Sequence, residues 1–162
     1  MKPILLATDG SPSAEAATQE AIGLAQAFDA PLIVVSVAHV VVPTYGGYYG
    51  YAEIASDLHQ AEVERVAHVL AETMERAEAE GLTVETEALE GPAAAEICRV
   101  AGGRAARLVV VGAHGWGRVG RLLHGSVSTD VLHRAPCPVL VVQGESPTAM
   151  EEPVAAEAVR TS

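Results

Sequence analysis

Glycine and serine residues follow a short apolar run in the last third of the chain, and their spacing suits phosphate chemistry. Leu108–Val111 is apolar and mostly β-branched, as in a strand that is buried on both faces of a parallel sheet. Glycine lets a backbone approach a phosphate closely, and a helix N-terminus presents free N–H donors to an anion. The alternative is an ordinary connection between a strand and a helix. The residues concerned are Gly112, Gly115, Gly125 and Ser126.

The charge of this region also suits an anion. Residues 102–134 contain five arginines and a single acidic residue, whereas the formal net charge of the whole chain is −11. A positive region in an acidic protein attracts phosphate groups. We expect Ser126 to cap a helix that runs from Val127 to about His133, with its hydroxyl as a further donor. Arg118 and Arg121 lie in the loop and either contact outer phosphates or remain solvated.

The spacing G-x2-G-x9-G-S that begins at Gly112 resembles the nucleotide-binding motif of the universal stress protein family, in its ATP-binding branch. The sequence GSVSTDVLHRAPCPVLVV that follows is similar to the family's final helix and strand, and ILLATDGSPSAEAA is similar to its start. The resemblance covers roughly residues 2–143. The departures from the family pattern are small: Trp116 stands where a polar or basic residue is expected, and the loop at residues 43–51 is unusual.

The resemblance implies that the chain binds ATP, with Mg²⁺ carried on the phosphates. Asp9, after the first strand, would hydrogen-bond the adenine or the ribose, and its alternative role is to cap the first helix. Val37 would contact adenine through its backbone. His114 lies between two glycines of the motif, but nothing near it in sequence would orient it as a base. We therefore assign no catalytic residue and no metal ligand.

The phosphate cradle would consist of the glycines of the motif, Ser126 and the N–H of Val127, and Ser128 would assist. Each contact between a charge and a helix dipole is worth about 0.3–1 kcal/mol, so several must act together. Ala7, Thr8 and Val111 would line the rest of the pocket. The complete expected site is Ala7, Thr8, Asp9, Val37, Val111, Gly112, His114, Gly115, Gly125, Ser126, Val127 and Ser128.

Five strands alternate with helices along the chain, which indicates an α/β fold with a parallel sheet. The strands are expected at residues 3–8, 32–37, 83–88, 108–111 and 139–142, and the long helix at Glu53–Glu80. A doubly wound sheet binds its ligand at the carboxyl ends of the strands where the winding reverses. The resemblance implies a Rossmann-like, mainly parallel sheet of five strands with the order 3-2-1-4-5.

The length fits one domain, which we expect to span residues 1–143, followed by a disordered tail at 144–162. Residues 38–52, rich in tyrosine and glycine, are expected to form a long loop; the alternative is a lid or a surface for a partner. Val139–Val142 is an apolar strand at the edge of the sheet, which is a liability unless it is covered. The resemblance implies a homodimer in which this strand pairs with its twin.

Composition excludes several classes of function. No apolar run approaches the roughly 20 residues that a membrane span needs, and the N-terminus reads as a strand rather than a signal peptide, so a cytoplasmic protein is expected. The acidic balance argues against nonspecific binding to DNA, RNA or anionic lipid. Cys98 and Cys137 lack the spacing of a metal site and are expected to be buried free thiols.

The expected function is that of an ATP-binding, dimeric stress-response protein whose nucleotide-dependent state is read by an unknown protein partner. The chain lacks the lysine motif of P-loop enzymes, so at most slow ATP hydrolysis is expected. An adenylating enzyme on this scaffold would carry a serine-rich, double-glycine loop, which Thr8–Pro12 does not match. A nucleotide-free interaction module of the same fold is the other alternative.

Overall fold

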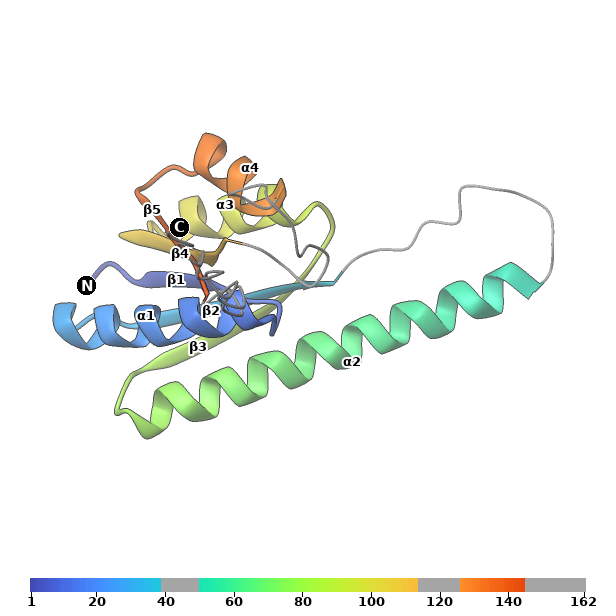
Figure 1. The fold of residues 1–162 in the computed structure, drawn as a ribbon, viewed down its shortest axis with the longest axis horizontal. Helices are drawn as coiled ribbons and strands as arrows, with labels where there is room; N and C mark the ends of the chain where they lie inside the picture. The colour runs from blue at the N-terminus through green and yellow to red at the C-terminus, as the bar shows by residue number, and fades with distance from the viewer. Residues whose placement is uncertain (39–49, 114–125, 145–162) are drawn as a thin grey trace, which may run out of the picture.

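A five-stranded, entirely parallel sheet forms the centre of the protein, with the strand order β3-β2-β1-β4-β5. The computed structural model describes residues 1–38, 50–113 and 126–144, and for residues 50–53 the backbone alone. Helices cover both faces of the sheet: α1 and α2 lie on one face, α3 and α4 on the other (Figure 1). The expected α/β class and strand order are confirmed.

The strands lie where the apolar runs predict them, with ends that differ by one or two residues. They are β1 (Ile4–Ala7), β2 (Leu32–Ala38), β3 (Val84–Glu90), β4 (Leu108–Gly112) and β5 (Val139–Val142). The helices are α1 (Pro12–Phe28), α2 (Gly50–Ala79), α3 (Ala93–Gly103) and α4 (Ser126–Arg134).

Two predicted helix boundaries are wrong. The helix α2 begins at Gly50, so the last residues of the expected loop are helical despite their glycine and tyrosine content. The helix α4 begins at Ser126. Ser126 therefore belongs to the helix rather than preceding it as a cap, and the residues before it lie outside the described part of the chain.

Register explains which backbone atoms are exposed at the carboxyl edge of the sheet. The central strand β1 pairs residue by residue with Leu32–Val35 on one side and Leu108–Val111 on the other. The strand β2 continues for three residues beyond this region, and Ser36–Ala38 pairs with β3 but with no other described strand. The end of β2 therefore projects past the end of β1.

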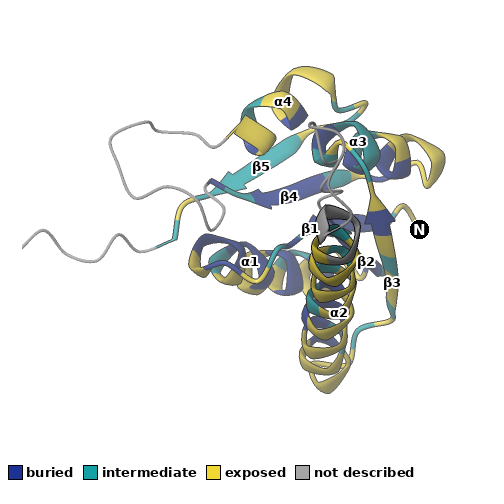
Figure 2. Ribbon diagram, turned by 90° about the vertical axis from the view of Figure 1, so that its right-hand side faces the viewer, coloured by how far each residue is buried: buried dark blue, intermediate teal, exposed yellow. Residues whose placement is uncertain are grey.

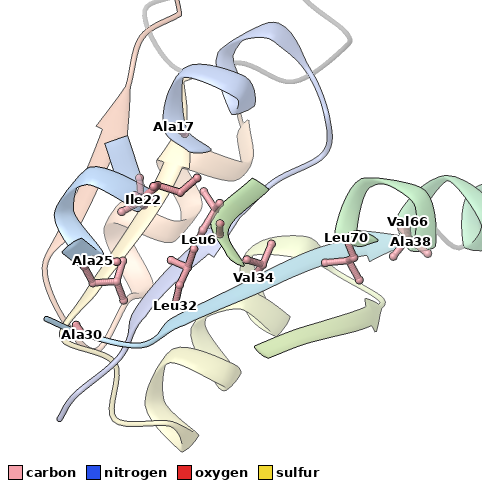
Figure 3. Close-up of a cluster of buried hydrophobic side chains, with 14 residues drawn as sticks. Leu6, Ala17, Ile22, Ala25, Ala30, Leu32, Val34, Ala38, Val66 and Leu70 are labelled. Carbon is pink, nitrogen blue, oxygen red and sulfur yellow. The ribbon is translucent and has the colours of Figure 1, made fainter. Parts of the chain in front are cut away.

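Alternate residues of the central strands enter two cores, one on each face. Leu6, Leu32 and Val34 pack with α1 and with the C-terminal half of α2, including Leu70 (Figure 3). Leu5, Ile33 and Val109 belong to the core beneath α3 and α4. Because the central strands β1, β2 and β4 are buried on both faces (β4 is drawn dark blue in Figure 2), they are apolar apart from the buried Ser36, which is the pattern that identifies them in the sequence.

The buried residues described in the long helix α2 all lie in its C-terminal half. Val66 and Leu70 are buried against the sheet, whereas none of the residues 54–65 is buried. Ile54 and Leu58 are 58% and 48% exposed, and Figure 1 shows the N-terminal half of the helix running past the sheet. Its acidic residues are mostly exposed, as expected. None of the described helices is long and apolar enough to cross a bilayer.

The two cysteines are free, as expected, but they are half-buried rather than buried. Cys98 and Cys137 pack against the core beneath α3 and α4 from its margin, so each keeps one side towards solvent. This partial burial raises the pKa of both thiols above the ordinary value. Of the expected tail only Gly144 is described, and the remainder lies outside the described residues.

Candidate functional site

The candidate site lies at the carboxyl ends of β1 and β4, the point where the winding of the sheet reverses. From β1 the chain proceeds outward through β2 and β3, and it then returns to the opposite side of β1 for β4 and β5. Ala7 is the register partner of Val111, so the residues that follow the two strands begin side by side. This is the position at which doubly wound sheets bind ligands.

The turn after β1 is held by hydrogen bonds of its own residues. The N–H of Thr8 donates to the carbonyl of Val35 at 3.0 Å, and Thr8 Oγ1 accepts from the N–H of Gly10 at 3.3 Å. Asp9 Oδ1 accepts from the N–H of Ser11 at 2.9 Å, while Ser11 itself caps α1 by accepting from Ala14. Asp9 thus stabilises the turn that leads into α1, which is close to the expected alternative role of capping this helix.

Val37 presents its backbone beyond the end of β1. The carbonyl of Val35 bonds to β1, and in a strand the N–H and C=O groups of residues i and i+2 point to the same side. The N–H and C=O of Val37 therefore both point towards the β1 side of the sheet, where β1 has already ended at Ala7. A donor and an acceptor next to each other are what the edge of a nucleobase requires.

Arg65 of α2 reaches this edge, although nothing in the sequence around it indicates such a role. Its Nη1 donates to the carbonyl oxygen of Asp9 at 3.0 Å, and its Nη2 lies 3.4 Å from the carbonyl oxygen of Val37. Within α2, Glu62 accepts from the same guanidinium at 3.0 Å. Asp9 and Val37 are 56 and 28 residues away from Arg65 in sequence, so the helical periodicity of α2 does not indicate these two contacts.

The first turn of α4 is fixed beside the end of β4. The hydroxyl of Ser128, which is 3% exposed, donates to the carbonyl of Ala113 at 3.2 Å. The N–H of Ala113 in turn donates to Val142 at 2.7 Å. Ser126 and Val127 are exposed, and the first turn of α4 contains no acidic residue. The N-terminal N–H groups and the partial positive charge of this helix thus lie at the candidate site.

Gly112 is required for the close packing of α1 against β4. A Cβ atom at this position would lie 2.8 Å from the backbone of Ser13 and Ala14 in the first turn of α1. Backbone atoms cannot give way as the end of a flexible side chain can. The absence of a side chain at Gly112 is therefore explained by the close approach of α1 to β4.

The other expected site residues divide into two groups. Thr8 and Val111 are 7% and 4% exposed and Ala7 is half-buried, and all three lie at the carboxyl ends of β1 and β4. The second group lies outside the described residues, which leaves those predictions as they stand. It consists of His114, Gly115, Arg118, Arg121, Gly125 and most of the predicted loop at 38–52.

A cleft of about 390 Å³ opens between α1 and α2, next to Thr8 and Gly10. Its wall includes the ion pair between Glu15 and Arg76, which are 2.7 Å apart. This hydrogen bond lowers the pKa of the Glu15 carboxyl and raises the pKa of Arg76. Two further glutamates line the cleft, so its potential repels phosphates, and we place the candidate anion site at α4 instead.

The described ranges 1–38, 50–113 and 126–144 contain no cluster of three or more histidine, cysteine, aspartate or glutamate side chains with the geometry of a metal site.

Comparison with known proteins gives consistent matches. Residues 1–143 match the model of the universal stress protein family. A universal stress protein of Thermus aquaticus is 40% identical over 146 residues, which is 88% of this chain and 98% of that protein. The structure of the universal stress protein UspA from Lactobacillus plantarum is similar, with a TM-score of 0.76, 26% identity, and coverage of 87% and 97%. A universal stress protein solved in complex with cAMP has a TM-score of 0.66 and 26% identity, with coverage of 89% and 98%.

Proposed function

Because this chain belongs to the universal stress protein family, we propose that it binds ATP at the carboxyl edge of its sheet. The observation that carries the proposal is that two complementary features meet at this edge. The backbone of Val37 offers a donor and an acceptor beyond the end of β1, and the first turn of α4 is tied to the end of β4. The complex of a similar protein with cAMP, an adenine nucleotide, supports the choice of base.

Adenine recognition is assigned to Val37. Its carbonyl would accept from the exocyclic amine of adenine, and its N–H would donate to the adjacent ring nitrogen. Guanine carries a carbonyl and a protonated nitrogen at the corresponding positions, so its donor and acceptor pattern would oppose that of Val37. Asp9 would hydrogen-bond the ribose or the base, and Ala7, Thr8 and Val111 would line the floor beneath them.

Phosphate binding is assigned to the N-terminus of α4 and the glycine loop that precedes it. The N–H groups of Ser126 and Val127 would donate to the phosphates, together with the backbone of Gly112, Gly115 and Gly125. The phosphates would carry Mg²⁺ into the site. Ser128 would assist only if its hydroxyl exchanged the carbonyl of Ala113 for a phosphate oxygen. His114 would line the loop without a catalytic role.

The output of binding is proposed to be a nucleotide-dependent state of a cytoplasmic homodimer, read by a protein partner. The strand β5 pairs with β4 on one side, and no other described strand lies on its other side. Val139–Val142 is apolar, and an exposed edge of this kind invites pairing with a second copy. Slow hydrolysis of ATP is compatible with this output, but efficient turnover is not expected.

The experiment that tests the proposal is a calorimetric titration of nucleotide-stripped protein with ATP and Mg²⁺, in the wild type and in Gly125→Val. A side chain at position 125 would enter the space of the phosphates, so binding is expected in the wild type and is expected to be lost in the variant. Gly23→Val is the matched control, since position 23 lies in α1 and a Cβ atom there meets nothing within 4 Å.

Two results would contradict the proposal. One is a folded wild-type protein that binds no nucleotide, which would favour an interaction module. The other is a folded Gly125→Val variant that retains the affinity of the wild type for ATP.

A further inference from the structure

Arg65 connects the middle of α2 to the edge of the sheet that we assign to adenine. Its guanidinium lies between two carbonyl oxygens, that of Asp9 after β1 and that of Val37 near the end of β2. Glu62, one turn earlier in α2, orients it through hydrogen bonds to Nε and Nη2 at 3.3 and 3.0 Å. The side chain is 31% exposed, so a ligand that approaches this edge from solvent reaches it directly.

The guanidinium and the amine of adenine are chemically alike at this position. Each is a planar N–H donor, and a guanidinium carries donors only. Both donors would bond to the carbonyl oxygen of Val37. This oxygen has two lone pairs, but the guanidinium and adenine still cannot bind together, because they would occupy the same space. Adenine must lie level with both the N–H and the C=O of Val37, in the space beyond β1 that lies between Val37 and Asp9. The guanidinium enters this space, because it reaches both carbonyls at once.

We propose that Arg65 is an internal competitor for the adenine position, so that its contact with Val37 and the binding of an adenine nucleotide exclude one another. This inference rests on the proposed ATP site. The contact is 3.4 Å long, weaker than the 3.0 Å contact with Asp9, so adenine displaces the guanidinium from Val37 at a modest cost.

Displacement of Arg65 also changes how α2 is held. Arg65 is the last residue before the buried part of the helix, which begins at Val66, and none of the residues 54–65 is buried. Besides the contact between His59 and Glu90 at 3.8 Å, its hydrogen bonds form a polar link between this half of α2 and the end of the sheet. Release of the link upon adenine binding loosens residues 54–65, and by linkage a partner that holds α2 docked lowers the affinity for ATP.

The test compares the affinity for ATP of the wild type, Arg65→Met and Arg65→Lys. Arg65→Met keeps the apolar stem and removes every donor, and it is expected to bind ATP about 3- to 10-fold more tightly, the range given by the loss of one competing hydrogen bond. Arg65→Lys is expected to show a smaller gain, since a single ammonium does not bridge both carbonyls. Removal of a positive charge alone weakens the binding of a polyanion, so a gain has no simple electrostatic explanation.

Two controls are needed. The first distinguishes an effect on adenine binding from an effect on phosphate binding, and the second distinguishes the loss of Arg65 from the loss of any positive charge in α2. Inorganic tripolyphosphate is expected to bind all the variants no more tightly than the wild type, because it lacks the adenine amine. Arg76→Met removes another arginine of α2 that pairs with Glu15 rather than with Val37, and its affinity for ATP is expected to stay within about twofold of the wild type.

Hydrogen exchange provides a readout that does not require nucleotide. Residues 54–65 are expected to exchange faster in Arg65→Met than in the wild type, and ATP is expected to produce the same increase in the wild type, whereas tripolyphosphate is not. Equal exchange in the variant and the wild type would overturn the assignment of Arg65 as the link to α2.

The outcomes distinguish this inference from the proposed function. If the wild type binds ATP and Arg65→Met binds it equally or more weakly, Arg65 is no competitor, while the ATP site stands. If neither protein binds ATP, both proposals fail. If Arg65→Met does not fold, Arg65→Lys decides the same question by the direction of its change in affinity.

Discussion

Gly112 and Arg65 are the two residues of the candidate site whose contacts are described most closely, and the sequence indicates only the first of them. Gly112 is visible in the sequence because a glycine that ends an apolar run marks a turn or a close approach. Its contact with the backbone of Ser13 and Ala14 shows that the close approach is to α1. Arg65 is invisible in the sequence, because its partners are backbone carbonyls of distant residues, and in α2 it looks like any solvated charge.

Gly112→Ala is expected to destabilise the protein by about 1–3 kcal/mol, because the new Cβ atom would meet backbone atoms at 2.8 Å and would push α1 away from β4. Chemical denaturation measures the change in the free energy of unfolding. Gly23→Ala serves as the control, and it is expected to be neutral or to stabilise by up to about 1 kcal/mol, since it lies in a helix with open space around it. Equal stabilities of Gly112→Ala and the wild type would show that this approach is not tight.

Helices and strands differ in how well the sequence predicts them. The strands are found accurately, because Leu5, Ile33 and Val109 belong to runs that must be apolar on both faces. The start of α2 is missed, because the glycines and tyrosines near residue 50 favour a loop locally. The cleft between α1 and α2 is missed for a different reason: it depends on how two helices lie on the sheet, which the periodicity of neither helix specifies.

The ion pair between Glu15 and Arg76 joins α1 to α2 across this cleft, and its strength is expected to depend on pH. The pKa of Glu15 is lowered by the hydrogen bond from Arg76, so the stabilisation is present above the ordinary carboxyl pKa of about 4.5. It is lost as the pH falls through the lowered value in the folded protein. The side chains are 43% and 49% exposed, so solvent limits the coupling to about 0.2–1 kcal/mol.

A double-mutant cycle with Glu15→Gln and Arg76→Met measures this coupling. The free energy of unfolding is expected to show coupling at neutral pH and none once the pH lies below the lowered pKa of Glu15 in the folded protein, where the carboxyl is protonated in both states. Coupling that persists unchanged in acid would mean that the two residues interact through packing and not through charge.

At the scale of the whole molecule, the resemblance to the universal stress protein family predicts the strand order that alternation alone leaves open. Alternating strands and helices indicate a parallel sheet, but several orders satisfy that pattern. The placement of β4 beside β1 brings Val111 next to Ala7, and this arrangement creates the edge at which Val37 and α4 converge. The glycine loop between β4 and α4 lies outside the described residues, so its part in the site remains a prediction.

The proposed dimer is tested most cleanly at Val141. The carbonyls of Pro138 and Val142 accept hydrogen bonds from the N–H groups of Val109 and Ala113. Because the backbone groups of successive residues in a strand point to opposite sides, the N–H of Val141 points away from β4, to the open edge of the sheet. Proline at this position removes an outward donor and spares the contacts with β4. Val141→Pro is expected to be a folded monomer by sedimentation equilibrium, whereas Val141→Thr stays dimeric. A folded, dimeric Val141→Pro would exclude pairing through this edge.

The most direct test of the central claim, that ATP binds at the carboxyl edge of the sheet, is chemical-shift mapping of the backbone amides of nucleotide-stripped protein. With ATP and Mg²⁺ we expect the largest changes at Asp9, Val37, Ser126 and Val127, with much smaller changes for GTP at equal concentration. Changes confined to the cleft between α1 and α2, or no change with any nucleotide in folded protein, would contradict the account.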